Sequence, residues 1–290
     1  MDYFFCDYVP QRYVFPSIKC CYASEKLQPR EEKNIFGEYF GGNVSFFLNL
    51  RAEMKYITLP KSLVGDTHLS FYLAMEEYVA RNIDEPDCFF MWQVEPTVIF
   101  GRNQVLQNEV NVPYCREHGI EIFRRKSGGG CVYADKDNIM LSFITQGDNV
   151  PMTFNRFMTM IIFVLQKLGV EAVGTTHNDV MIGDRKVCGT AFYQLPGRSI
   201  VHSTMLYDTN MEHMLNAITP PAEKLQKNGV ESVRQRITFL KEYVSLNIEE
   251  LKAFIRQTLC QGELQLTEAD VEGIRKIEQE YLNREFIQRL

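Results

Sequence analysis

The ten residues Arg124-Arg125-Lys126-Ser127-Gly128-Gly129-Gly130-Cys131-Val132-Tyr133 are the most informative stretch of the sequence. They follow an alternating run, residues 120–124, that predicts a half-buried strand. Three consecutive glycines let the backbone approach a ligand closely and turn its N–H groups inward, and the basic side chains supply charge for a carboxylate or phosphate. A flexible surface loop with solvated charges is the alternative. The basic triplet at the end of a strand favours an anion-binding site.

A second polar cluster lies between residues 178 and 191. Asn178-Asp179 precedes Lys186, which opens a predicted strand containing the small residues Gly189 and Ala191. Small residues leave room for a ligand, and a lysine held beside them can supply positive charge to a developing negative oxygen. A lysine on a solvated hairpin fits the spacing equally well, so both interpretations stay open at this point.

Hydrophobic patterning predicts the fold class. Helical periodicity covers residues 154–168, and a short helix is expected to end near His118, before Gly119. From Asn210 onward the pattern is helical to the C-terminus, with breaks at Pro220-Pro221 and Gly262. Strands are predicted over residues 88–94, 97–100, 120–124, 131–133, 139–144, 170–173, 179–182, 186–192 and 199–206. Tight turns such as Gly183-Asp184 join strand pairs, so we expect an α+β domain with a mixed, mostly antiparallel β-sheet packed with helices. Neither GxGxxG nor GxxxxGK[ST] is present, and strand–helix alternation is missing, which argues against a doubly wound nucleotide-binding sheet.

Composition excludes several classes of protein. The 290 residues are 45% hydrophobic and 23% charged, which is typical of a globular chain with a sizeable core. The net charge of −6 argues against broad nucleic-acid or anionic-membrane binding, and no apolar run approaches the roughly 18 residues of a membrane span. The eight cysteines form no CxxC pair, and the N-terminus lacks a secretory signal, so we expect a reducing, cytoplasmic setting.

The chain divides into three parts by pattern. Residues 1–53 contain 12 of the 35 aromatic residues, yet they show neither a helical period nor bounded strand alternation. We therefore expect the functional polypeptide to start at Met54, with 1–53 a mis-assigned extension; a family-specific arm that packs on the domain is the alternative. Residues 54–260 are predicted to form the main folded domain, and 261–290 a charged C-terminal helix.

Five ordered elements within residues 54–260 resemble the lipoate–protein ligases, in the wider family of biotin/lipoate ligase catalytic domains. Gly101-Arg102-Asn103-Gln104 is similar to the GRxQ element of that family, and residues 124–133 are similar to its RRxSGGGxVY signature. The other three similar elements are ND…KxSGxA at Asn178-Asp179 and residues 186–191, HGTLL at residues 202–206, and VRSR at residues 232–236.

The resemblance implies a fold like that of biotin/lipoate ligases and class II aminoacyl-tRNA synthetases. It implies that lipoate and ATP form lipoyl-adenylate, with Mg²⁺ as metal, and that a lysine of an acyl-carrier domain then takes the lipoyl group. The carriers would be lipoyl domains of 2-oxoacid dehydrogenase complexes or the glycine cleavage H protein. By the same resemblance Lys186 would be the catalytic cation, and Asp179 would face the adenylate or its Mg²⁺. Residues implied to bind ATP or the adenylate are Arg125, Gly130, Cys131, Val132, Tyr133, Asp179 and Lys186; further pocket candidates are Arg102, Ser127, Gly128, Gly129, Asn178, Gly189 and His202.

The sequence also departs from that family. Ala134 stands where many relatives have histidine, Asp137 replaces a glycine, and Cys188 replaces a serine. Cys188 raises the alternative of an ATP-independent octanoyl or lipoyl transferase with a thiol nucleophile. In such enzymes, however, the cysteine lies in an element before the ND segment. Buried, inert thiols are the simpler interpretation of Cys188 and Cys131. Biotin ligase fits less well, because its GRGR-type loop is not matched.

A larger departure is the end of the chain, where the small C-terminal domain of many ligases is expected to be missing. A separate accessory chain would supply it, or the protein would work without it. A non-catalytic lipoyl-binding subunit that needs a partner is therefore the third alternative.

Overall fold

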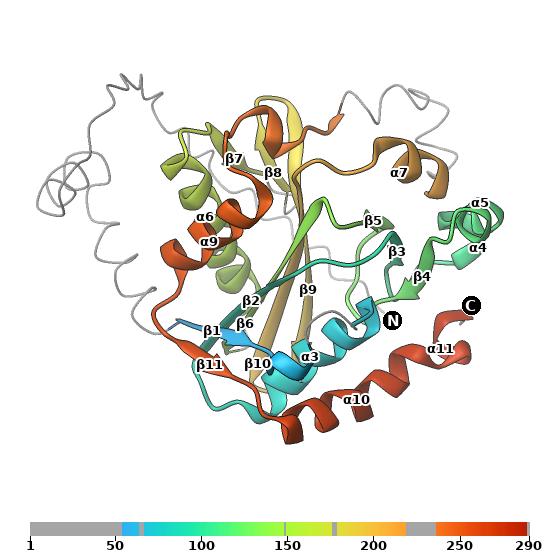
Figure 1. The fold of residues 1–290 in the computed structure, drawn as a ribbon, viewed down its shortest axis with the longest axis horizontal. Coiled ribbons are helices and arrows are strands. Elements are labelled where there is room, and N and C mark those ends of the chain that lie inside the picture. The colour runs from blue at the N-terminus through green and yellow to red at the C-terminus, as the bar shows by residue number, and fades with distance from the viewer. Residues whose placement is uncertain (1–53, 64–66, 148, 176–178, 219–235, 289–290) are drawn as a thin grey trace, which may run out of the picture.

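A computed structural model describes residues 54–63, 67–147, 149–175, 179–218 and 236–288. Its centre is an eight-stranded sheet with the strand order β11-β1-β2-β6-β10-β9-β8-β7 (Figure 1). The β11–β1 and β1–β2 pairs are parallel, and the other five neighbouring pairs are antiparallel, which confirms the expected α+β class. The strands are β1 (Met54–Thr58), β2 (Asp87–Trp92), β6 (Asn138–Gln146), β7 (Ala172–Gly174), β8 (Asp179–Ile182), β9 (Arg185–Leu195), β10 (Arg198–Leu206) and β11 (Glu263–Gln265).

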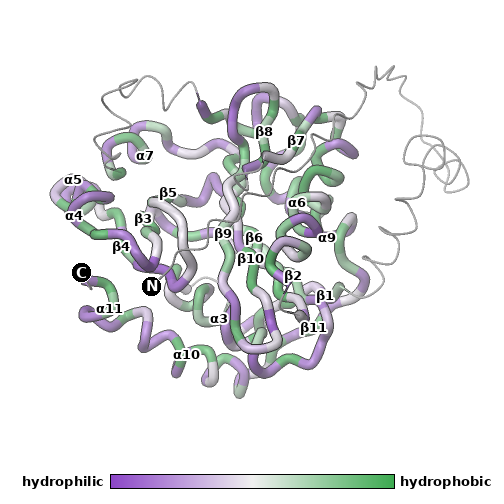
Figure 2. The backbone as a smooth tube through the Cα atoms, turned by 180° about the vertical axis from the view of Figure 1, so that it is seen from behind, coloured by the Kyte–Doolittle hydropathy of each residue, from purple (hydrophilic) through white to green (hydrophobic). Residues whose placement is uncertain are grey.

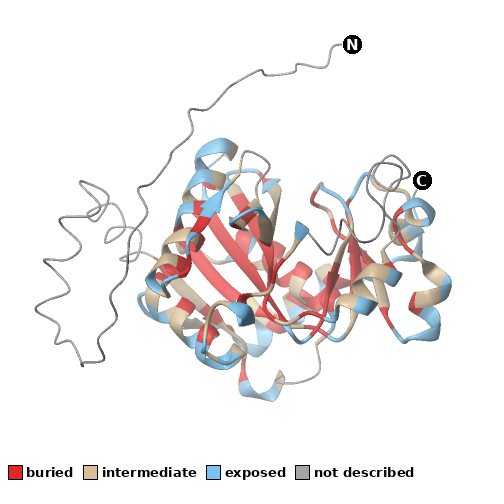
Figure 3. Cartoon of the chain, turned by 90° about the horizontal axis from the view of Figure 1, so that it is seen from above, coloured by how far each residue is buried: buried red, intermediate tan, exposed pale blue. Residues whose placement is uncertain are grey.

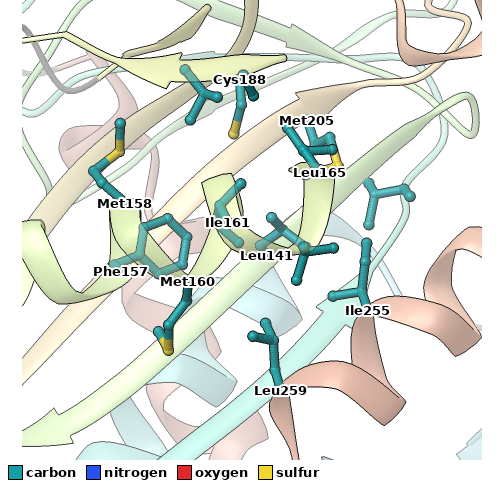
Figure 4. Close-up of a cluster of buried hydrophobic side chains, with 14 of the residues drawn as sticks. Leu141, Phe157, Met158, Met160, Ile161, Leu165, Cys188, Met205, Ile255 and Leu259 are labelled. Carbon is teal, nitrogen blue, oxygen red and sulfur yellow. The ribbon is translucent and has the colours of Figure 1, made fainter. Parts of the chain in front are cut away.

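Strand β6 shows how the sheet separates two apolar layers. Successive side chains of a strand point to opposite faces. On one face Ile139, Leu141 and Phe143 join a cluster with α6 (Val150–Lys167) and α9 (Ile248–Leu259), part of which Figure 4 shows. On the other face Met140 and Ile144 pack under α3 (Leu69–Asn82) and α10 (Glu268–Leu282). The central strands are therefore buried on both sides, as Figure 3 shows.

The helices begin where their sequences supply a cap. Asn149 accepts a hydrogen bond from the backbone N–H of Met152 at the start of α6, and proline occupies its first turn. Capping boxes start α9, at Asn247 and Glu250, and α10, at Thr267 and Asp270. Figure 2 shows that hydrophobic residues dominate α6, whereas hydrophilic ones are frequent along α10. Each helix thus buries only the face that its pattern provides.

A three-stranded sheet, β4-β3-β5, stands beside the large one and carries the glycine-rich loop. It consists of β3 (Thr97–Phe100), β4 (Glu121–Arg124) and β5 (Val132–Ala134). The helices α4 (Leu106–Glu109), α5 (Val112–Glu117) and α7 (Met211–Ala217) pack with it around a small apolar cluster. The glycine-rich loop connects β4 to β5, so its two ends are fixed by the strands that flank β3 on either side.

The helix expected to end near His118 is present as α5, which ends at Glu117 with His118 as its C-cap, but a second short helix precedes it. Two short helices, α4 and α5, occupy this region, and Val110 between them is extended and forms an isolated bridge with Ile218. Asn111 then caps α5 by accepting from the N–H of Tyr114, with proline in the first turn. Such a cap begins a new helix and cannot sit inside a continuous one.

The helical pattern expected after Asn210, with breaks at Pro220-Pro221 and Gly262, did not include a strand, yet β11 begins directly after Gly262. Pro220-Pro221 lies outside the described residues. Strand β11 pairs in parallel with β1, and its three residues are partly or fully exposed. Three residues are too few to show an alternating apolar pattern. They form a strand because the backbone of β1 provides the pairing. The short helices α11 (Arg284–Gln288), η1 (Lys61–Leu63) and η2 (Leu240–Glu242) complete the described elements.

Residues after 260 pack directly on the core. Helix α10 lies along α3 (Figure 1), and Gly273 is the point of closest approach, because a Cβ there would meet the ring of Tyr78 at 2.2 Å. The segment 1–53 lies outside the described residues. None of the helices in the described ranges has the length and apolar character needed to cross a bilayer.

Candidate active site

A cavity of about 1000 Å³ lies between the large sheet and the three-stranded sheet. Its apolar end is formed by Leu73, Trp92, Ile99 and Met140, all members of the cluster under α3. A second end lies under α7, where Tyr133, Met214, Leu215 and Ile218 form the wall. Between the two ends the glycine-rich loop faces strands β8 and β9. The cavity wall therefore combines residues of two apolar clusters with polar groups of the glycine-rich loop and of strands β8 and β9.

The glycine-rich loop is held by close backbone contacts. Gly101 lies against it, so that a Cβ on Gly101 would meet the carbonyl oxygen of Gly129 at 2.0 Å. Gly129 itself has a φ of 91°, a conformation that favours glycine. The Ser127 carbonyl accepts a hydrogen bond from the N–H of Arg102 at 2.9 Å. Glycine is required at positions 101 and 129 because no side chain fits there.

Arg125 lines the cavity, but most of its donors are used by the loop. The guanidinium donates to the carbonyls of Gly128 and Gly130 at 2.7 and 2.8 Å from Nη2, and to the carbonyl of Ile99 at 3.0 Å from Nη1. Burial lowers the pKa of Arg125 to about 10, which leaves it charged at neutral pH. Arg125 thus shapes the loop and adds a fixed positive charge to the cavity wall.

The other two basic residues of the triplet hold the fold together. Arg124 is fully buried and donates to the carbonyls of Arg102, Gln104 and Ile287. Lys126 forms ion pairs with Glu77 and Glu280, at 2.8 and 2.7 Å. Neither residue is among those lining the cavity. The sequence pattern indicated three cations for an anion site, whereas the structure directs only Arg125 to it.

Lys186 and Asp179 form an ion pair on the opposite wall. The Lys186 Nζ lies 2.8 Å from Asp179 Oδ1, and the two side chains are 38% and 27% exposed, so a ligand in the cavity has access to both. Gly189 makes this arrangement possible, because a Cβ there would lie 2.7 Å from both Cε and Nζ of Lys186. Arg125 and Lys186, which the sequence places 61 residues apart, line one cavity.

The remaining predicted residues fall into two groups. Gly129, Gly130, Cys131, Val132, Tyr133, Gly189 and His202 line the cavity together with Arg125, Asp179 and Lys186. Ser127 and Gly128 do not line it: Ser127 is buried behind the loop, where its hydroxyl contacts His202. The Arg102 side chain is exposed, and only its backbone holds the loop. Asn178 lies outside the described residues.

Sequence reasoning missed Glu109. Its side chain is only 8% exposed, lines the cavity, and forms no hydrogen bond or ion pair with any residue in the described part of the chain. Its charge acts on Arg125 and on the thiol of Cys131, whose pKa burial raises to about 12. No motif marks Glu109, because the groups that it acts on, Arg125 and Cys131, come from another part of the chain. A carboxylate here can accept hydrogen bonds from ligand amines or hydroxyls.

The arrangement suits an anionic ligand that carries an apolar group. Backbone and cationic groups of the cavity wall favour phosphate or carboxylate oxygens, and the residues of the two apolar clusters favour a hydrocarbon chain and a flat ring. Among the described residues, no group of three or more His, Cys, Asp or Glu side chains is placed to hold a metal ion.

Comparison with known proteins gives a consistent result. Residues 68–260 match the family model of the lipoyl protein ligase A/B catalytic domain. The chain is 37% identical over 213 residues to lipoate–protein ligase 1 of Staphylococcus aureus, an alignment that covers 71% of this chain and 65% of that protein. The chain thus spans less than two thirds of the length of that relative.

Solved structures show the same fold. A bipartite lipoate protein ligase from Thermoplasma acidophilum, studied with its E2 lipoyl domain, superposes with a TM-score of 0.72 at 24% identity, covering 82% of this chain and 97% of that one. A lipoate–protein ligase A bound with ATP gives a TM-score of 0.68 at 22% identity, covering 82% and 100%. With the family match over more than half its length, the chain belongs to the lipoyl protein ligase A/B catalytic domain family.

Proposed function

We propose that this protein activates lipoate with ATP and transfers the lipoyl group to a lysine of an acyl-carrier domain. The observation that carries the proposal is that Arg125 and Lys186 line one cavity, which also offers an apolar end. The names of the similar proteins, lipoate–protein ligases with one bound to ATP, support the choice of substrates.

The first half-reaction joins two anions. A lipoate carboxylate oxygen attacks the α-phosphorus of ATP, and the bond to the pyrophosphate leaving group breaks. Both reactants are negatively charged and repel each other, so Lys186, assisted by the charge of Arg125, would offset the repulsion and stabilise the charge that develops on the phosphoryl oxygens. In the second half-reaction the carrier amine attacks the lipoyl carbonyl and AMP leaves. The nucleophile comes from the partner, so the cavity needs none of its own.

The two ends of the cavity divide the adenylate between them. The apolar end at Leu73, Trp92 and Ile99 fits the acyl chain and its ring. The end beneath α7 fits the nucleoside, with Tyr133 in the wall and Glu109 as an acceptor for its amine or hydroxyl groups.

A magnesium ion fits this site as a companion of ATP. Asp179 and Asp184 are carboxylates of the cavity wall, and Mg²⁺ in nucleotide sites is usually held by one or two carboxylates together with the phosphates. When bound, the ion would neutralise phosphate charge. Asp179 is its proposed ligand, and the Lys186 ammonium beside it would limit how closely the ion approaches.

The proposed partners follow from the reaction. The acceptor lysine would belong to a lipoyl domain of a 2-oxoacid dehydrogenase complex or to the glycine cleavage H protein. A separate accessory chain is part of the proposal, because one similar structure is described as a bipartite lipoate protein ligase. We place the reaction in the cytoplasm.

The proposal is tested with the full chain, lipoate, Mg-ATP and an apo carrier domain. Intact-mass spectrometry is expected to show the lipoyl increment on the carrier only when ATP is present. A carrier that gains the group from an acyl donor protein without ATP would identify a transferase. Tight lipoate binding without AMP release would identify a non-catalytic subunit. This outcome must hold both for the chain alone and after a separate accessory chain has been added.

Replacement of Cys188 by alanine is expected to leave lipoylation within about twofold of the wild type. The thiol lies in the apolar cluster between the sheet and α6 (Figure 4), and burial raises its pKa to about 11. A thiol that stays neutral at physiological pH is a poor nucleophile. Initial rates of carrier lipoylation check the prediction. Loss of activity in Cys188→Ala, together with an acyl adduct on the wild-type enzyme, would establish the transferase mechanism instead.

A further inference from the structure

A continuous chain of hydrogen bonds runs from the glycine-rich loop into the core. The Ser127 hydroxyl contacts Nε2 of His202 at 2.7 Å, and Nδ1 of His202 contacts Glu76 Oε2 at 2.9 Å. The second carboxylate oxygen of Glu76 accepts from the Ser142 hydroxyl at 2.5 Å, and Ser142 in turn accepts from the indole N–H of Trp92 at 2.8 Å. We name these five residues the buried polar chain.

The fold places these side chains together on the face of the sheet that α3 covers. His202 of β10 and Ser142 of β6 are paired across the strands, and Phe90 of β2 is the next partner of Ser142. Glu76 comes from α3 above them. All five residues are at least nine-tenths buried. Polar groups buried to this extent destabilise the fold unless they form hydrogen bonds. The hydrogen bonds of the buried polar chain therefore fix where each of the five side chains lies.

Both nitrogens of His202 are engaged in this chain. A carboxylate only accepts, so Nδ1 donates to Glu76, and Nε2 is left to bond with the Ser127 hydroxyl. The ring is still part of the cavity wall near Trp92, at the apolar end. His202 therefore offers a ligand the face of its ring and has no free nitrogen with which to bind it.

The buried polar chain ends at Ser127, the residue that begins the glycine-rich turn. The Ser127 carbonyl accepts a hydrogen bond from the N–H of Arg102. The carbonyl of the next residue, Gly128, accepts from the Arg125 guanidinium. The side chain of Ser127 has no role in lining the cavity. Its hydroxyl is the link between the turn and β10.

We propose that His202 is a positioning residue for the nucleotide, although it lies at the acyl end of the cavity. Through Ser127 it holds the start of the glycine-rich turn at a set distance from β10, and Glu76 fixes the orientation of its ring. The inference rests on the proposed function, and it assigns His202 to the ATP step and not to recognition of the acyl group.

Two variants remove the link from either side. His202→Phe keeps a ring in the cavity wall but removes both nitrogens, and Ser127→Ala removes only the hydroxyl. Each is expected to raise KM for ATP about fivefold or more, with KM for lipoate within twofold of the wild type. The double variant is expected to resemble His202→Phe, because both changes break one interaction and their effects do not add.

The matched control is Ser199→Ala on the same strand. Ser199 is fully buried and donates to the Gly147 carbonyl at 2.7 Å, away from the cavity. It is expected to leave both KM values unchanged. A rise in KM for lipoate with unchanged KM for ATP in His202→Phe, or fully additive effects in the double variant, would overturn the positioning role.

Amide hydrogen exchange separates this inference from the proposed function. In the absence of substrates, exchange across residues 127–131 is expected to be faster in His202→Phe and Ser127→Ala than in the wild type and in Ser199→Ala. This readout needs no activity, so it holds even if the ligase assay fails. Unchanged exchange in Ser127→Ala, the milder variant, would contradict the inference whatever the kinetics show.

Discussion

Replacement of Lys186 by alanine is expected to slow carrier lipoylation about a hundredfold or more. Lys186 lines the cavity with a side chain that is 38% exposed, and under the proposed function its ammonium would lie near the attacking carboxylate and the α-phosphate. Removing a group that stabilises developing negative charge costs roughly 3 kcal/mol in the transition state. Pyrophosphate release under saturating lipoate and ATP, followed by transfer from preformed lipoyl-adenylate, measures the two half-reactions separately. Near-normal rates in both would refute the assignment.

Two further variants separate the charge from the surrounding fold. Arg185→Ala removes the neighbouring cation, which pairs with Glu242 and Tyr243 and does not line the cavity, and it is expected to retain activity. Gly189→Ala keeps the lysine but places a methyl group where its Nζ lies, so the side chain must move. This variant is expected to fold normally and to lose most of its activity.

Replacement of Gly101 by alanine is expected to impair nucleotide binding and stability together. The new Cβ would lie 2.0 Å from the Gly129 carbonyl oxygen, and backbone atoms cannot rotate away as a side chain can. Overpacking of this kind costs about 2 kcal/mol of unfolding free energy, and a displacement of about 1 Å in the loop can cost about a hundredfold in rate. Calorimetric titration with ATP and thermal unfolding measure the two effects.

Gly174→Ala is the matched control for that experiment. A Cβ at Gly174 would meet the tips of the Ile162 and Met158 side chains, at 3.2 and 3.5 Å, and both side chains can adjust. It is expected to leave ATP binding unchanged and to shift the unfolding temperature little. If Gly101→Ala bound ATP as well as Gly174→Ala does, the packed glycine loop would not be the nucleotide site.

The parts of the fold that the sequence predicted are those governed by local pattern. Strand β8 begins and ends where the alternation and the Gly183 turn indicated, and Gly183 has the positive φ that such a turn requires. The stripe of α6 likewise follows from its own residues. In contrast, β11 is a strand only because β1 lies beside it. No property of its three residues indicates that partner.

The candidate site shows the same division. Gly129, Gly130 and Lys186 were marked by their own chemistry, and they line one cavity. The roles of Arg124 and Lys126 depend on residues 163 and 154 positions away, Ile287 and Glu280, so their charges could not be assigned from spacing. Glu109 was missed for the same reason, because only its surroundings distinguish it.

The contact between Arg124 and the Ile287 carbonyl has a consequence for the order in which the protein folds during its synthesis. The Arg124 guanidinium also donates to the carbonyls of residues 102 and 104, next to the glycine-rich turn. In the large sheet, the edge of β1 is covered only when β11 pairs with it. Ribosomes synthesise a chain from its N-terminus, so Ile287 and β11 emerge long after Arg124 and β1. The contacts that support residues 102 and 104, and the pairing of β11 with β1, are therefore expected to form late in folding, after the residues between them have been made.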